Sequence, residues 1–390
     1  MPEIVCSKCK AVFTNFDEEK CPKCGASSPI IHDFKESDEI LKEKASLIRD
    51  TRRSVGLEGL VGGLDSIIIN TDPNRQKLAV KELLSYTGFD FETALETDEK
   101  RICVLKRRNS ANILVTSRLN GENPFVSFNS FPKSRHLPNT RLETFVFNVT
   151  NIEKYILIQK SRGIEFLTPE INENKNFSFI QTKPSKLTGN SIGFIEWKKE
   201  KGNYFGDKCR GLGWEFMKPE KDYLGSVGRL DHAATRVEAQ NRDLAIIEFM
   251  SLTNYNFDFA IYVKNFNSIT TVARLSKKDF ALVFTSGISS YSNSETSGPT
   301  EKYIHNYGPR VHHVAFKTKN IEDTFVELGN DGMDFLINIV GSRKQGLKQT
   351  FSIGSPNTLL VNEYIHRYGN FDGFFTKNNV TLLTAATEKQ

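Results

Sequence analysis

Three segments that lie far apart in the sequence each place a histidine or a glutamate inside an apolar run with the pattern of a β-strand. They are residues 230–232, 311–316 and 360–367. A polar side chain in such a run is costly unless it binds a partner. Two histidines and one carboxylate on one face form the ligand set of a non-haem Fe(II) oxygenase, because this set leaves coordination positions open for substrate and O2. The segments therefore indicate a candidate oxygenase site.

The alternation of strand side chains limits which residues can share this site. Successive side chains of a strand point to opposite faces, so His312 and His313 are not expected to point inward together. If His313 faces the cavity, Val311 accompanies it and His312 lies on the other face. The same alternation separates Glu363 from His366.

The elements that must position these residues recur in order along the chain. Strand-like and helix-like segments follow one another roughly as βαβββ, twice within residues 64–200 and twice from Leu230 onward. The expected strands of the first half include residues 102–106, 113–117 and 125–128, with helices at 76–86 and 152–161. Sheets built from such modules curve into open barrels. The sequence therefore predicts an α+β fold with two open-barrel domains of paired βαβββ modules.

The candidate ligands occupy matching places in this repeat. His232 and His313 lie in the first strands of the two later modules, and Glu363 lies in the last strand. The first half has Asp65-Ser66 and Thr144-Phe145 in the corresponding strands and offers no such trio. We therefore expect one half to hold a metal and the other to serve as scaffold.

Four cysteines near the start of the chain indicate a second, structural metal. Cys6, Cys9, Cys21 and Cys24 form two C-x2-C knuckles, which can place four thiolates around Zn2+. Four cysteine ligands leave no open coordination position, so this zinc is expected to be structural. The sequence as a whole predicts three domains and two linkers. They are a zinc ribbon at 1–35, a linker helix at 36–63, a non-metal domain at 64–200, a linker at 201–228 and a catalytic Fe(II) domain at 229–390.

Composition and charge exclude several other classes of protein. Hydrophobic residues make up 38% and charged residues 25%, the balance of an ordinary globular protein. The net charge of +5 is spread along the chain without a basic stripe, which argues against nucleic-acid binding. No apolar run is long enough to span a membrane and no signal-peptide pattern is present, so we expect a cytoplasmic protein. It could assemble as a homo-oligomer.

The second half of the chain resembles the 4-hydroxyphenylpyruvate dioxygenase and hydroxymandelate synthase family of the vicinal-oxygen-chelate superfamily. The resemblance rests on four motifs of that family, which are similar to residues 309–315 (G-x-x-H-[IV]-A), 349–352 (Q-[IL]-F-T), 363–367 (E-x-I-Q-R) and 369–375 (G-N-F-x-x-L-F). Together these motifs cover roughly residues 229–380.

The resemblance implies a mechanism and roles for individual residues. His232, His313 and Glu363 would hold Fe(II), and a 2-oxo acid would chelate the metal while O2 takes the remaining position. Oxidative decarboxylation and hydroxylation of the same molecule would follow. Gln349 and Asn370 are the implied catalytic residues, and a helix around Asn370–Phe375 would gate the pocket. The implied substrate-binding residues are Thr271, Phe284, Ser286, Gln349, Phe351, Phe371 and Phe375.

Departures from the family keep other functions open. Thr271 and Phe284-Thr285-Ser286 replace the pocket residues that are usual in the family and change the polar anchors of the pocket. The expected substrate is therefore not 4-hydroxyphenylpyruvate alone but 4-hydroxyphenylpyruvate or a related aryl or alkyl pyruvate. From His313 to Glu363 the interval is 363 − 313 = 50 residues, which is short for the family and comparable to that of extradiol ring-cleaving dioxygenases. That class needs a further base, for which His305 and Tyr303 are candidates. A third alternative is a non-catalytic binding protein that keeps the metal fold.

Overall fold

The computed structural model describes residues 4–5, 12–13, 23–24, 38–369, 371 and 373–390 of the chain. In the first two of these ranges β1 (Ile4–Val5) pairs with β2 (Val12–Phe13) in antiparallel fashion. Three of the predicted zinc ligands (Cys6, Cys9 and Cys21) and the predicted catalytic Asn370 lie outside the described residues, so the zinc site stays a prediction.

The first large sheet has nine strands in the spatial order β11-β4-β5-β6-β3-β7-β10-β9-β8. Its centre is the antiparallel pair β3–β7, where the two modules of this half meet. The strands are β3 (Val61–Asn70), β4 (Asp90–Glu96), β5 (Lys100–Lys106), β6 (Asn112–Arg118), β7 (Arg141–Val149), β8 (Asn172–Glu173), β9 (Phe177–Gln181), β10 (Ser191–Trp197) and β11 (Arg210–Gly211).

The second sheet repeats this plan with eight strands in the order β13-β14-β15-β12-β16-β19-β18-β17. Its two modules meet at the antiparallel pair β12–β16. The strands are β12 (Val227–Arg236), β13 (Asn256–Val263), β14 (Ser268–Arg274), β15 (Ala281–Ser286), β16 (Arg310–Thr318), β17 (Phe335–Ser342), β18 (Leu347–Gly354) and β19 (Val361–Arg367). The predicted α+β fold of paired βαβββ modules is therefore confirmed.

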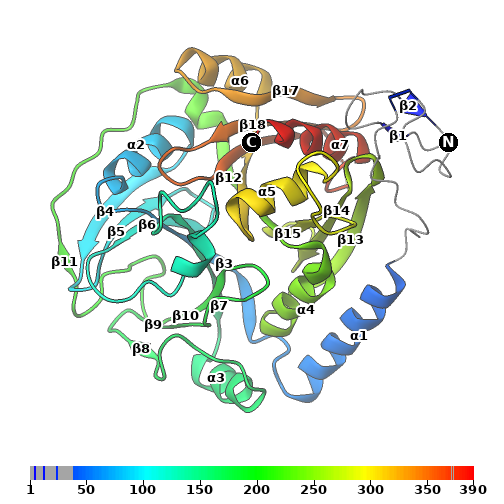
Figure 1. Ribbon diagram of the computed structural model, residues 1–390. Coiled ribbons are helices and arrows are strands. Elements are labelled where there is room, and N and C mark those ends of the chain that lie inside the picture. Colours follow the sequence, from blue (N-terminus) through cyan, green and yellow to red (C-terminus); the bar gives the residue numbers. More distant parts are fainter. Residues whose placement is uncertain (1–3, 6–11, 14–22, 25–37, 370, 372) are drawn as a thin grey trace.

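Helices connect the strands and cover the sheets. Helix α7 contacts β13 and β17, the two edge strands of the second sheet, and therefore closes the open side of this curled sheet (Figure 1). The helices are α1 (Glu39–Ser54), α2 (Gln76–Tyr86), α3 (Ile152–Ser161), α4 (Arg242–Leu252), α5 (Pro299–Tyr307), α6 (Ile321–Asn330) and α7 (Lys377–Ala386). The corresponding helices α3 and α6 begin alike, since the side chains of Asn151 and Asn320 each accept a hydrogen bond from a backbone N–H of the first turn.

Two sequence predictions of secondary structure are wrong. Residues 125–128 do not form a strand, because Val126–Asn129 is a short 3-10 helix and β4 supplies the missing strand. Strand β4 was not recognised because polar residues alternate along it and interrupt any apolar run. The helix expected around Asn370–Phe375 does not exist among the described residues there, since α7 begins at Lys377 after its N-cap Thr376.

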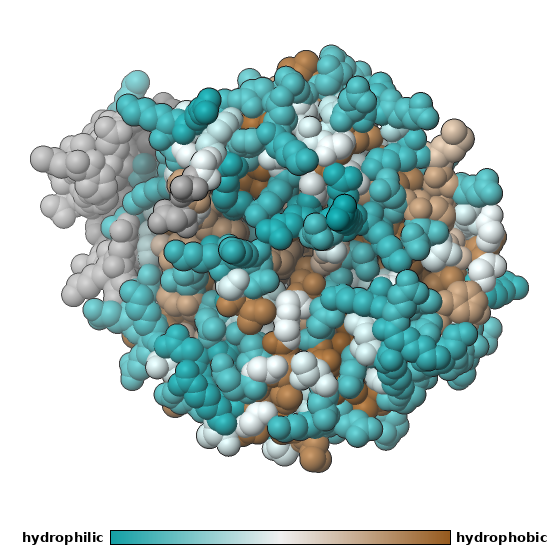
Figure 2. All heavy atoms as spheres, turned by 180° about the vertical axis from the view of Figure 1, so that it is seen from behind, coloured by the Kyte–Doolittle hydropathy of each residue, from teal (hydrophilic) through white to brown (hydrophobic). Residues whose placement is uncertain are grey.

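One hydrophobic core joins the two large sheets. The ring of Phe147 on β7 lies 5.7 Å from that of Phe249 on α4 and 5.3 Å from that of Tyr255, measured between centroids. These contacts cross from the first half of the chain to the second. Among the described residues no helix is long and apolar enough to span a membrane. The face in Figure 2 is mainly hydrophilic, with hydrophobic residues exposed between the polar ones.

Candidate metal centre

The strand registers bring the three candidate ligands to one face of the second sheet. Between β12 and β16, His232 pairs with Ala315 and Ala234 pairs with His313. Between β16 and β19, Ala315 pairs with Glu363. Paired residues on neighbouring strands share a face, and so do residues two apart on one strand. All three polar side chains therefore converge on the concave side of the sheet.

The distances between these side chains suit a metal ion. Nε2 of His232 lies 3.0 Å and Nε2 of His313 lies 3.2 Å from the same oxygen, Oε2 of Glu363. One potential ligand atom from each residue lies within 4.8 Å of the other two. His232 and Glu363 are buried, yet Nε2 of His232 makes no well-directed hydrogen bond. A buried nitrogen without a partner, aimed at a carboxylate and a second imidazole, fits a site that a metal ion completes.

A β-bulge brings Asp231 beside His232. Leu230 pairs with Phe316 and His232 pairs with Ala315, so Asp231 is one extra residue on β12. Its Oδ2 lies 2.8 Å from Nδ1 of His232. The bulge thus places a carboxylate behind a candidate ligand that follows it directly in the sequence.

A second bulge has the same effect on the neighbouring strand. Ala234 pairs with His313 while Thr235 pairs with Val311, so His312 is the extra residue on β16. Nδ1 of His312 lies 2.8 Å from Nδ1 of His313. Each candidate histidine therefore has its Nδ1 held by the bulged residue that precedes it, and its Nε2 faces Glu363.

This geometry corrects the expected orientation of His312. The ring of His312 lies 5.8 Å from that of Phe351 on β18, whose cross-strand partner is Glu363. Val311, which was expected to accompany His313, instead belongs to the core between the sheets. The expectation was wrong because strict alternation holds only where no residue is inserted into the ladder.

Further partners fix the protons of both histidines. Arg367 donates to both oxygens of Asp231, at 2.7 and 3.0 Å, so this carboxylate accepts the Nδ1 proton of His232. His312 donates from Nε2 to Oε1 of Gln390, at 2.7 Å, and its Nδ1 can then accept the Nδ1 proton of His313. In the neutral form of both histidines Nε2 therefore keeps its lone pair for a metal ion.

The carboxylate of Glu363 is held in the same manner. Nε2 of Gln349 donates to its Oε1 at 2.6 Å, and Nδ2 of Asn379 donates to Oε1 of Gln349 at 3.0 Å. Oε2 of Glu363 is left to face the histidines. The predicted catalytic residue Gln349 thus lies behind a candidate ligand, where it orders the surroundings of the candidate metal centre.

Burial and the neighbouring charges shift the pKa values in this cluster. Burial acts to lower the pKa of His232, but the nearby carboxylates of Glu363 and Asp231 raise it to about 9. Burial acts to raise the pKa of Glu363, and the adjacent His232 and His313 lower it to about 2. Burial lowers the pKa of His313. The carboxylate is therefore ionised, as a ligand for a cation must be.

Aromatic residues cover the candidate metal centre. Relative to the ring of His232, the centroids of Phe374 and Phe375 lie at 5.4 and 5.1 Å. The ring of Phe351 lies 4.7 Å from that of His313. Phe371 packs farther out, against the positive-φ Gly346, where a Cβ atom would come within 2.5 Å of its ring. These rings exclude water from the buried side of the centre.

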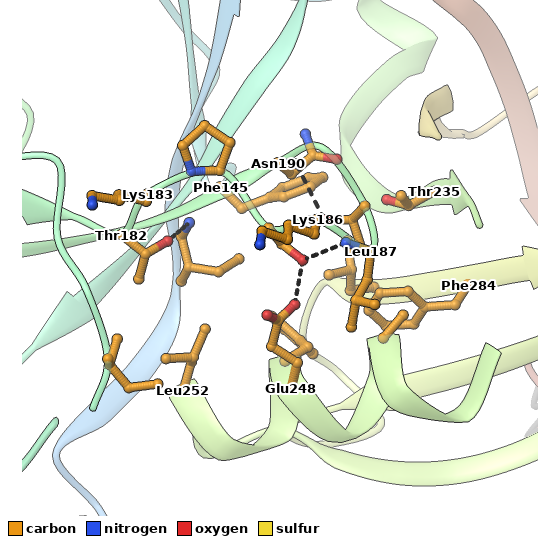
Figure 3. A pocket seen from close by; sticks show the side chains of 18 of the residues that line it. Phe145, Thr182, Lys183, Lys186, Leu187, Asn190, Thr235, Glu248, Leu252 and Phe284 are labelled. Atoms are coloured by element: carbon orange, nitrogen blue, oxygen red, sulfur yellow. Dashed lines mark hydrogen bonds between the residues drawn. The ribbon is translucent and has the colours of Figure 1, made fainter. Parts of the chain in front are cut away.

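Three predicted substrate-binding residues are not brought to this centre. Thr271 pairs with Phe284, and Thr271 donates to the carbonyl oxygen of Phe284 at 3.2 Å. Phe284 belongs to the core and lines a pocket of about 480 Å³ on the opposite side of the sheet, together with Glu248 of α4 (Figure 3). Ser286, two residues beyond Phe284, shares its face. The residues of β14 and β15 that face the centre are instead Thr270, Val272, Val283 and Thr285.

The first sheet shows what these positions contain without a metal group. In β3–β7, Ser66 pairs with Val146 and Ile68 pairs with Thr144. These two pairs correspond to His232–Ala315 and Ala234–His313 of the second sheet. Gly193 of β10 pairs with Val146, in the place of Glu363. The bulge before Ser66 is also present and contributes Asp65. The counterparts of the candidate ligands are therefore Ser66, Thr144 and Gly193, which cannot form the same metal site.

The sequence analysis missed several residues that hold the centre. They are Asp231, Arg236, His312, Arg367, Phe374 and Asn379. Asp231 was detectable as a charged residue in an apolar strand, directly before a candidate ligand. Arg236 was detectable by alternation, since it lies four residues after His232. The contact of Asn379 with Gln349 had no sequence signal, because it depends on how α7 packs.

Comparison with known proteins identifies the fold. No protein-family profile and no curated protein sequence matches this chain. A mutant of 4-hydroxymandelate synthase from Streptomyces coelicolor has a similar structure, with a TM-score of 0.64 and 16% identity over 85% of this chain and 99% of that chain. A xylose isomerase-like TIM barrel/4-hydroxyphenylpyruvate dioxygenase fusion protein has a TM-score of 0.60 and 14% identity, over 90% of this chain and 58% of that chain. The chain thus has the two-domain vicinal-oxygen-chelate fold.

Proposed function

We propose that the protein is an Fe(II)-dependent dioxygenase that oxidatively decarboxylates a 2-oxo acid and hydroxylates the same molecule. The observation that carries this proposal is the convergence of His232, His313 and Glu363 on one buried face. Two histidines and one carboxylate favour non-haem Fe(II) over a closed structural metal. The names of the two similar structures refer to hydroxymandelate and 4-hydroxyphenylpyruvate. This supports an aryl or alkyl 2-oxo acid as the substrate.

The residues around the centre have separate roles in this proposal. Bound Fe(II) would supply the coordination positions for the 2-oxo acid and O2 and the redox chemistry of decarboxylation and hydroxylation. Asp231 and His312 orient the two imidazoles through Nδ1, and Gln349 orients Glu363 through Oε1.

The substrate pocket lies on the concave face in this proposal. Phe351, Phe374 and Phe375 would form its aromatic wall. Thr270 and Thr285, whose hydroxyl oxygens lie 3.3 Å apart, would add polar groups on the same face of the sheet. These residues replace Thr271, Phe284 and Ser286 as the proposed contacts. The rings of Phe374 and Phe375, which cover His232, would keep water from the reacting substrate.

The extradiol alternative receives less support. Its candidate base His305 is exposed and stacks on Tyr291, with ring centroids 4.1 Å apart. Tyr303 is buried against Arg236 and His312. Neither residue is free to act as a base next to an open coordination position.

Metal content and oxygen consumption test the proposed function. We expect about one Fe for each chain, and about one Zn if the four cysteines form the predicted site. Under anaerobic conditions a 2-oxo acid should produce a metal-to-keto charge-transfer band. When air is then admitted, the protein should consume O2. The His313→Ala variant should lose iron and both signals.

A neighbouring histidine provides the matched control. His366 lies on the same strand as Glu363, but its Nδ1 lies 2.9 Å from the carbonyl oxygen of Thr318. The His366→Ala variant should retain iron and turnover. Full iron and turnover in His313→Ala would refute the assignment of this ligand, and oxygen uptake with catechols alone would favour ring cleavage.

A further inference from the structure

A buried arginine lies on the same face as the candidate metal centre. Arg236 is in β12, four residues beyond His232, so its side chain returns to the face of His232 and Ala234. The bulge in this region does not disturb the alternation on β12, because its extra residue, His312, belongs to β16. Arg236 is only 4% exposed.

Within the described part of the chain the guanidinium of Arg236 has no hydrogen-bond acceptor and no ion-pair partner, and its Nη1 is fully buried. Its one specific contact is with the ring of Tyr303, whose centroid lies 4.9 Å from Cζ. A cation over an aromatic face is stabilised, but the ring accepts no in-plane hydrogen bond from the guanidinium. The donors of Arg236 therefore remain unused.

Two other buried arginines lie near Arg236, since Arg310 is its cross-strand partner and Arg141 acts together with both on Tyr303. Arg141 donates to the carbonyl oxygen of Pro309 at 3.0 Å, and Arg310 donates to that of Thr140 at 2.8 Å. These neutral acceptors satisfy hydrogen bonds without removing charge. Arg141 and Arg310 thus have partners, whereas Arg236 does not.

The carboxylate of Glu301, which acts to raise the pKa of Arg236, is engaged elsewhere. Oε1 of Glu301 accepts from the backbone N–H of Gly287 at 2.8 Å, and Oε2 accepts from that of Tyr291 at 3.2 Å. Glu301 makes no ion pair with Arg236 among the described residues. Among the described residues no carboxylate therefore forms an ion pair with the guanidinium of Arg236.

A short chain of contacts links Arg236 to the candidate metal centre. Tyr303 contacts Arg236 on one side and His312 on the other, with 4.9 Å between the ring centroids of Tyr303 and His312. His312 is bonded to His313. After burial, the charge of Arg236 is a cause of the lowered pKa of His312, and it also contributes to the lowered pKa of His313.

We propose that Arg236 binds a second carboxylate of the substrate, so the substrate is a 2-oxo dicarboxylic acid. This inference rests on the proposed function, in which the 2-oxo acid group itself chelates the metal. A guanidinium can bind a carboxylate through two parallel hydrogen bonds, and burial strengthens this pair. A buried charge without a partner destabilises the free protein. A protein keeps such a residue where the charge contributes to ligand binding.

Matched pairs of 2-oxo acids test the proposal by anaerobic calorimetry of the Fe(II)-loaded protein. The pairs are 2-oxoadipate with 2-oxohexanoate, and 4-carboxyphenylpyruvate with 4-methylphenylpyruvate. In at least one of the two pairs, we expect the dicarboxylate to bind roughly 30-fold or more tightly than the matched monocarboxylate. The Arg236→Gln variant should lose this preference, Arg236→Lys should retain part of it, and the exposed-site control Arg343→Gln should retain all of it. Equal affinities for both members of each pair in the wild type would overturn the proposal.

Thermal unfolding of the metal-free protein provides an independent readout. Glutarate, a dicarboxylate without the keto group, should raise the melting temperature of the wild type and leave that of Arg236→Met unchanged. Without ligand, Arg236→Met should melt at the same or a higher temperature than the wild type, since it removes an unpartnered charge. A destabilised variant that glutarate stabilises as much as the wild type would show that Arg236 is structural.

The two experiments also separate this proposal from the proposed function. If neither member of a pair binds while glutarate acts through Arg236, the anion site exists and the proposed 2-oxo acid chemistry fails. If both members bind equally well, the proposed function remains and the dicarboxylate assignment fails.

Discussion

At the residue scale, each candidate ligand is held through an atom that faces away from the metal group. Asp231 holds His232, His312 holds His313, and Gln349 holds Glu363. Such contacts fix the tautomer of an imidazole and the rotamer of a carboxylate before a metal arrives. The donor set is therefore preorganised, which lowers the conformational entropy that metal binding must offset.

Asp231→Asn tests this preorganisation. The amide keeps the size of the side chain but removes the negative charge that Arg367 and His232 share. We expect Fe(II) affinity to fall about 10–100-fold, because outer partners of ligating histidines have effects of this size. Competition with a chromogenic Fe(II) chelator under anaerobic conditions measures the change.

The first sheet supplies the control for this variant. Asp65 occupies the same bulge position there, but it accepts from Trp197 and Tyr204, both at 2.9 Å, rather than from a histidine. Asp65→Asn should leave Fe(II) affinity unchanged. An equal loss in both variants would mean that Asp231 acts on the fold rather than on the metal centre.

At the element scale, two bulges and one helix shape the site. The bulges on β12 and β16 each turn an additional polar side chain toward the concave face. Helix α7 closes that face and brings Asn379 onto Gln349. The site thus depends on local departures from ideal strands, which occur at the same positions in both central strands.

Helix α5 is tied to the loop after β15 by Glu301, and this gives a pH-dependent stability. Burial, opposed by hydrogen bonds from Gly287 and Tyr291, raises the pKa of Glu301 to about 7. A carboxyl group whose pKa is higher in the folded state than in the unfolded state favours folding below its ordinary pKa of 4.5. This contribution is lost as the pH rises through about 7.

The Glu301→Gln variant tests this linkage by urea unfolding at pH 4.5 and pH 8. The stability advantage of the wild type over the variant should decrease by roughly 3 kcal/mol between these values. The exposed Glu295→Gln is the control and should track the wild type. A constant difference between wild type and Glu301→Gln would contradict the prediction.

At the scale of the whole molecule, the two sheets form one cooperative unit around a shared core. Phe147 of the first sheet is fully buried against Phe249 and Tyr255 of the second half. Unfolding of either sheet would expose the shared core to water, so we expect both sheets to unfold in one transition. The sheet with the candidate ligands therefore shares its core with the sheet that lacks them.

Phe147→Ala should destabilise both sheets together. Removing this buried ring should cost about 3–5 kcal/mol, through lost apolar contacts and the cavity left behind. Denaturant unfolding followed by circular dichroism and by loss of bound iron should give one shifted transition. Phe205→Ala, at a surface position of the first half, should have little effect. Two separate transitions in the Phe147 variant would contradict a shared core.

The sequence alone determined the βαβββ repeat and the three ligand candidates. Both follow from local patterns, since apolar periodicity reports the elements and a polar residue inside an apolar strand reports a site. The absence of a comparable trio in the first half was also readable, and the registers assign its counterparts to Ser66, Thr144 and Gly193.

Only the tertiary structure decided which side chains face the centre. A bulge inserts one residue and reverses every later orientation on its strand, so His312 joined His313 and Val311 moved to the core. The pairing of β14 with β15 likewise decided that Thr271 and Phe284 face away from the centre. The packing around Arg236 left its guanidinium without a partner among the described residues. Bulges arise from pairing between distant strands, which has no local signature in the sequence.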